Sequence, residues 1–135
     1  METVERVVTL PVDVDQAWAL VVDADWLGAD ARLEPRPGSA GRVVDPDGTA
    51  RGLVLDAVEV GRRLTWHWWE VEDDAAISHV EVSLEPVEEG TRVRVVERVS
   101  AEPAGPQACA RAGDAWSHRL LHLESLLLVA AAVRG

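Results

Sequence analysis

Glu97 is the polar residue with the clearest potential for chemistry. It has the same strand parity as Val93 and Val95, so a regular strand directs its carboxylate inward with two apolar neighbours. A carboxylate in such surroundings is a candidate acid, base or ligand anchor. Alternatively, the adjacent Arg98 indicates that Glu97 lies at the solvent-exposed rim of the strand.

The four histidines form two pairs whose spacing would suit a shared cation. His118 and His122 are four residues apart in a helical segment, and a turn centred near residues 73–74 pairs His67 with His79. The second pair is expected on the sheet face that points away from the helix. Neither pair is part of a recognisable set of metal ligands. We therefore expect no metal and no other cofactor.

No nucleophile motif accompanies these residues. The single cysteine, Cys109, lies in an alanine-rich helical segment without a partner for an internal disulfide, so we expect a buried, unreactive thiol. The sequence contains no nucleophile elbow, phosphate-binding loop or dinucleotide fingerprint. Beyond Glu97 we assign no catalytic residue, and we do not expect covalent catalysis.

Composition excludes several classes of function. The 135 residues include 24 acidic and 13 basic side chains, for a formal net charge of -11, and 47% of the chain is apolar. Such a chain lacks the basic surface that nucleic acid or anionic lipid requires. Neither a signal peptide nor a membrane-spanning stretch is visible. We therefore expect a single domain over residues 1–135 in the cytoplasm, with no nucleic-acid or membrane partner.

Strands position most of these side chains. Alternation predicts a first strand at residues 3–11, followed by a helix capped by Asp13 or Asp15 and a second short helical turn at residues 23–30. Turn signals then surround a short strand at 42–45. Four further strands and a terminal helix are expected at residues 53–60, 64–71, 78–86, 92–100 and 107–133. Short polar turns between consecutive strands favour an antiparallel meander.

The terminal helix has one apolar stripe. Its positions recur at spacings of three and four: Cys109, Ala112, Trp116, Leu120, Leu123 and Leu127. A sheet packed against this stripe gives a two-layer α+β domain. Residues 126–133 are apolar on every side, so either additional core or a partner helix covers them, and homodimerisation is one hypothesis.

Several short motifs occur in the order found in a known superfamily. They are Trp18 and Trp26 in the opening helices, the Gly-led segment 52–68 with Arg63-Leu64, the Gly90-Thr91 turn, and the segment 113–127 with a late Trp followed by leucines. In this order the chain resembles the helix-grip, START-like (SRPBCC) superfamily, and within it the homologues of the activator of the heat-shock-protein-90 ATPase. The chain departs from that pattern in lacking Phe and Tyr, and Val60-Gly61 stand where a proline pair is common.

The resemblance implies a helix-grip (START/Bet v 1-like) fold. In this fold a curved antiparallel sheet of six or seven strands wraps around a long C-terminal helix, with two short helices after the first strand. It also implies a cavity between the sheet and the long helix. The identity of a ligand or substrate does not follow from it.

The tryptophans predict where a ligand would bind. Alternation puts Trp66 and Trp68 on one face of residues 64–71, and small helical residues opposite leave room beside them. The same tryptophans would serve equally well as core filler. We expect ligand contacts from Trp18, Trp66, Trp68, Val80, Val82, Val95, Glu97, Cys109, Ala112 and Trp116. Residues 108–116 of the helix are expected to open onto this cavity.

Three functions fit this interpretation. The first is a domain that binds a small apolar or aromatic ligand. The second is an enzyme of the polyketide cyclase or hydrolase kind, with Glu97 as base and the cavity as the orienting surface. The third, implied by the family name, is a chaperone-interacting module. We favour binding over catalysis because the sequence offers no second catalytic group.

Overall fold

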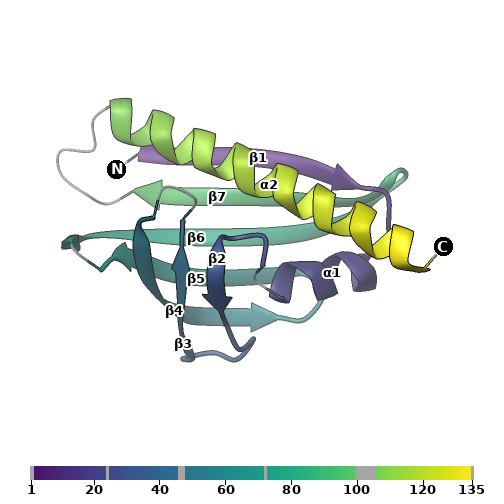
Figure 1. Ribbon diagram of the computed structural model, residues 1–135, viewed down its shortest axis with the longest axis horizontal. Coiled ribbons are helices and arrows are strands. Elements are labelled where there is room, and N and C mark those ends of the chain that lie inside the picture. Colours follow the sequence, from purple (N-terminus) through teal and green to yellow (C-terminus); the bar gives the residue numbers. More distant parts are fainter. Residues whose placement is uncertain (1, 24, 46–47, 72, 100–105, 135) are drawn as a thin grey trace.

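The computed structural model describes residues 2–23, 25–45, 48–71, 73–99 and 106–134; for 2, 29, 73–76, 106–111 and 129–134 only the backbone is described. These residues form one seven-stranded antiparallel sheet and two helices, and the longer helix lies across one face of the curved sheet (Figure 1). We call the face that this helix covers the inner face and the opposite one the outer face.

The strands form a meander that the first strand extends at its far edge. They are β1 (Glu2–Leu10), β2 (Ala29–Arg32), β3 (Ala40–Val44), β4 (Ala50–Glu59), β5 (Arg63–Glu70), β6 (Asp73–Val87) and β7 (Gly90–Val99). In the described chain their order is β1-β7-β6-β5-β4-β3-β2, and every neighbouring pair is antiparallel. The predicted helix-grip arrangement is confirmed.

Helix α1 (Val14–Val22) follows β1, and Asp13 caps it. The Asp13 carboxylate accepts a hydrogen bond from the Gln16 backbone nitrogen at 2.9 Å, which satisfies one free N–H of the first turn. The described residues after α1 differ from the expected second helix, because they form turns around Trp26 and then enter β2. The buried Trp26 indole donates to the Val21 carbonyl at 2.9 Å and so occupies a carbonyl at the end of α1.

Helix α2 (Pro106–Arg134) begins at a proline, as the first turn of a helix permits. It runs beside β1 and ends near α1 (Figure 1). The predicted stripe is buried at Trp116, Leu120 and Leu123. No helix in the described residues is long and apolar enough to cross a membrane.

The strand register confirms the predicted alternation. β5 and β6 pair His67 with His79, and β6 and β7 pair Val80 with Glu97. The inner face therefore carries a set of side chains that are all buried: Trp66, Trp68, Val80, Val82, Val95 and Glu97. The sheet thereby directs a carboxylate and two indoles toward the face that α2 covers.

Candidate functional site

Glu97 lies in the interior and not at the rim. It is 4% exposed, and the regular pairing of β7 through this position directs it to the inner face. Its Oε2 accepts a hydrogen bond from Trp68 Nε1 at 2.7 Å, and its Oε1 accepts one from Trp116 Nε1 at 2.8 Å. One carboxylate therefore connects β5, β7 and α2, and both of its oxygens already have a partner.

Four indoles pack together around this carboxylate. The rings of Trp68 and Trp116 are stacked, with centroids 5.5 Å apart and planes at 22°. Trp26 lies 5.9 Å from Trp116, and Trp66 lies 5.9 Å from Trp68 in an edge-to-face arrangement. Trp66 Nε1 is buried and has no hydrogen-bond partner among the described residues. The cluster thus contains one indole donor that is not satisfied.

Arg119 on α2 lies over the faces of two of these indoles. Its Cζ is 4.6 Å from the ring centroid of Trp116 and 4.9 Å from that of Trp68, which is cation–π geometry. Its Nε donates to the Leu27 carbonyl at 3.0 Å, and its Nη2 donates to Asp45 Oδ1 at 2.7 Å. Arg119 therefore ties α2 to the segment before β2 and to the end of β3.

Asp45 binds two arginines. Its Oδ2 accepts from Arg51 Nε at 2.7 Å, and the Arg51 guanidinium lies 4.8 Å from the Trp68 ring. Burial lowers the pKa of Arg119, and the contact with Asp45 opposes that shift. Because arginine stays protonated in proteins, Arg119 and Asp45 form a buried ion pair.

Sequence reasoning missed both members of this pair. Helical spacing gave a signal for Arg119, which lies three residues after Trp116 and four before Leu123, on the apolar stripe. No comparable signal exists for Asp45, because an acid just ahead of a turn is ordinarily exposed. The two residues are 74 positions apart, so only the fold brings them together.

The other predicted site residues lie near the cluster or outside the described side chains. Val80, Val82 and Val95 are buried in the inner face. Ala112 and Trp18 are partly buried and pack against the same core. Cys109 lies among residues 106–111, whose side chains are not described. Residues 108–116 were expected to open onto a cavity, and the structure describes the side chains of this segment only from residue 112 onward.

A groove of about 350 Å³ lies between the middle of α2 and the segment before β2. Its lining residues are Trp26, Leu27, Gly28, His118, Arg119, Leu121, His122 and Ser125. Trp26 and Arg119 also belong to the aromatic cluster, so the cluster bounds the groove on its inner side. A Cβ at Gly28 would clash with the Val44 carbonyl oxygen, so glycine allows this close approach to β3.

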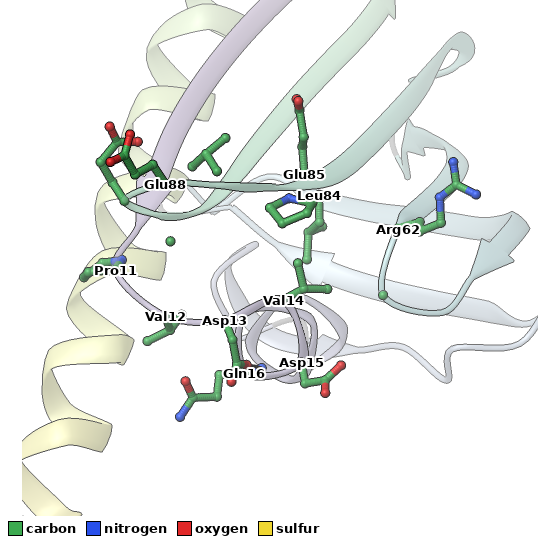
Figure 2. A pocket seen from close by; sticks show the side chains of 15 residues that line it. Pro11, Val12, Asp13, Val14, Asp15, Gln16, Arg62, Leu84, Glu85 and Glu88 are labelled. Atoms are coloured by element: carbon green, nitrogen blue, oxygen red, sulfur yellow. Dashed lines mark hydrogen bonds between the residues drawn. The ribbon is translucent and has the colours of Figure 1, made fainter.

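A larger open cleft of about 1120 Å³ lies at one end of the sheet, between the β1–α1 connection and the β4–β5 and β6–β7 turns (Figure 2). The charged ends of Glu85, Arg62 and Asp15 point in different directions in Figure 2. Asp13 lines it as well, and its carboxylate caps α1. A binding pocket uses polar groups that converge. We therefore take the groove, and not this cleft, as the candidate site.

The outer-face histidines are neighbours, as predicted. The rings of His67 and His79 are 5.8 Å apart, and His67 Nδ1 lies 2.9 Å from Asp56 Oδ1. The described residues contain no group of three or more His, Cys, Asp or Glu side chains that could hold a metal ion. These histidines lie on the face opposite the groove.

Comparison with known proteins identifies the family. A family model described as "Activator of Hsp90 ATPase homolog 1-like protein" matches residues 1–127. The chain belongs to this family. Solved structures include close matches in fold, whereas no curated protein matches the sequence.

Three solved structures show how far this Hsp90-activator-like fold is shared. Protein MLL2253 from Mesorhizobium loti is 22% identical, with a TM-score of 0.79 over 93% of this chain and 96% of that one. DynU16, a protein in the dynemicin biosynthetic locus, is 24% identical, with a TM-score of 0.81 over 94% of this chain and 47% of that one. The Aha1 dimer from Colwellia psychrerythraea is 15% identical, with a TM-score of 0.73 over 92% and 94%. These identities establish the fold alone.

Proposed function

We propose that this domain binds a small molecule with an apolar or aromatic body in the groove between α2 and residues 26–28. The observation that carries the proposal is that Trp26 and Arg119 line the groove and also belong to the aromatic cluster. A ligand in the groove therefore meets side chains that hydrogen bonds to Val21, Leu27 and Asp45 already hold in place. The groove's volume of about 350 Å³ is at the lower end for small-molecule sites, which favours a compact ligand.

None of the ligand contacts predicted from the sequence is among the described residues that line this groove; Trp116 and Trp68 lie behind Trp26 and Arg119. Trp66 does not line the groove either, and its buried Nε1 has no partner among the described residues. An unpaired buried donor of this kind costs about 1–3 kcal/mol.

Binding is favoured over catalysis by the surroundings of Glu97. A general base needs hydrogen-bond access to the proton that it removes. Both Glu97 oxygens accept from indole N–H groups, and the residue does not line the groove. Its geometry is that of a residue that positions Trp68 and Trp116. The cyclase and chaperone-interaction alternatives remain predictions.

The indole N–H signals of the six tryptophans provide a direct test by ¹H–¹⁵N NMR. A neutral aromatic probe, 2-naphthamide, and its acid, 2-naphthoate, would be titrated into the protein after assignment by single Trp→Phe variants. The Trp26 and Trp116 signals are expected to shift, while Trp69 on the outer face stays unchanged. The proposal is overturned if neither probe moves the Trp26 signal, or if both move only Trp69.

A matched pair of variants on α2 would locate the ligand. Ser125→Leu adds bulk to the groove at an exposed position whose hydroxyl donates only to the Leu121 carbonyl of its own helix. Glu124→Leu makes the adjacent exposed residue apolar without lining the groove. We expect at least a tenfold loss of affinity in the first variant and less than a twofold change in the second. Equal affinities would contradict binding in the groove.

A further inference from the structure

Among the described residues that line the groove, the charged or titratable side chains are two imidazoles and one guanidinium, with no carboxylate. His118, Arg119 and His122 all contribute to its α2 wall. This lining contrasts with the chain as a whole, whose formal net charge is -11. Charges farther than about 8 Å are largely screened at physiological ionic strength, so the nearby groups decide which ligand charge is favoured.

One guanidinium nitrogen of Arg119 is engaged neither by Leu27 nor by Asp45. Its Nε and Nη2 are used by Leu27 and Asp45, whereas Nη1 makes no hydrogen bond to a described residue. Asp45 in turn divides its two oxygens between Arg119 and Arg51. The other buried carboxylate nearby, Glu97, is engaged by the two indoles that separate it from the guanidinium.

The two histidines extend this donor set along the helix. His118 and His122 lie one turn apart, and each imidazole offers at least one N–H donor whether it is neutral or protonated. The carboxylates of Asp25, Asp30 and Glu124 are exposed and do not line the groove. The exposed apolar side chain of the groove is Leu121 on α2, whereas Trp26 and Leu27 close the facing wall and are each only 1% exposed.

We propose that the groove is selective for an aromatic carboxylate, with its ring along Leu121 and the edge of residues 26–28 and its carboxylate against His118, Arg119 and His122. This inference rests on the proposed function, because it names the class of ligand for the same groove. A monoanion matches the donor set better than a phosphate, because one free guanidinium nitrogen and two imidazoles offer few donors for three charged oxygens.

Calorimetric titration with 2-naphthoate, 2-naphthamide and 2-naphthyl phosphate would test this selectivity, because the three probes share one ring system. We expect the carboxylate to bind about tenfold more tightly than the amide, since charge-assisted hydrogen bonds are roughly twice as strong as neutral ones. The affinity advantage of the carboxylate over the amide should shrink when the salt concentration is raised from about 20 to about 300 mM.

Variants would then assign the advantage to the groove. His118→Gln/His122→Gln is expected to reduce the preference for the carboxylate to threefold or less. The control, His67→Gln/His79→Gln, removes the same groups from the outer face and should leave the preference unchanged. Equal binding of carboxylate and amide, with the Trp26 signal still shifting, would overturn the selectivity alone. Tighter binding of the phosphate would overturn it as well, whereas failure of all three probes would overturn the proposed function.

Discussion

Replacing Asp45 by asparagine would remove the charge that neutralises a buried arginine. The Arg119 side chain is only 3% exposed, so water can replace little of what its guanidinium loses with Asp45. Asparagine keeps one carbonyl oxygen but directs an NH₂ group toward the second arginine, Arg51. Breaking a buried pair by removing one partner costs about 3–5 kcal/mol.

A double-mutant cycle separates the coupling energy between Asp45 and Arg119 from the cost of each single substitution. Arg119→Met keeps much of the apolar stem and leaves Asp45 with Arg51 as its remaining partner, so we expect a smaller loss of about 1–3 kcal/mol. In the combined variant no uncompensated buried charge remains from this pair. The loss of unfolding free energy in the combined variant should therefore be smaller than the sum of the two single losses by about 2 kcal/mol.

Urea unfolding followed by tryptophan emission measures each free energy, provided that the m-value is unchanged. Asp45→Asn should also lower the melting temperature by about 10–20 °C in a domain of this size. Glu34→Gln serves as control, because Glu34 pairs with Arg36 at the surface and should change the free energy by less than about 1 kcal/mol. Additivity of Asp45→Asn and Arg119→Met within about 0.5 kcal/mol would refute the reasoning.

Three further substitutions test the packing around the site. Glu97→Gln replaces an acceptor by a donor next to one indole N–H, so the unfolding free energy should fall by about 1–3 kcal/mol. The NMR signal of one indole N–H, that of Trp68 or Trp116, should also be displaced. Unchanged signals would contradict the two hydrogen bonds to Glu97. Gly28→Ala would force a Cβ against the backbone oxygen of Val44 and should lower the unfolding midpoint in urea strongly. Gly113→Ala meets only the far end of the flexible Arg6 side chain and should cost less; a loss as large as that of Gly28→Ala would contradict the distinction between a backbone clash and a side-chain contact.

The period of the apolar pattern explains why much of the fold was predictable. Strand alternation placed Trp66, Trp68 and Glu97 on one face, and the spacing of three and four placed Trp116 in the buried stripe of α2. The family resemblance supplied the long helix across the sheet, which the match over residues 1–127 supports. These features depend on local periodicity, which a single sequence records.

The features that could not be predicted depend on contacts between remote segments. The chain after α1 forms turns and not a helix, and the Trp26 indole there is bound to the Val21 carbonyl and packed on Trp116. The partners of Arg119 lie 92 and 74 residues away, at Leu27 and Asp45. Propensity assigns an arginine to the surface unless a partner is known. The groove was missed because its two walls come from these segments.

The stacked indoles explain how the interior holds a carboxylate and a guanidinium that do not touch. An aromatic ring has a negative face and a positive edge. Arg119 lies over the faces of Trp68 and Trp116, while Glu97 accepts from the N–H groups at their edges, so each charge meets the favourable part of the same two rings. Because α2 is fixed to the sheet by this arrangement, the inner wall of the groove would already be set when the proposed ligand binds. Such preorganisation reduces the entropy that binding must lose.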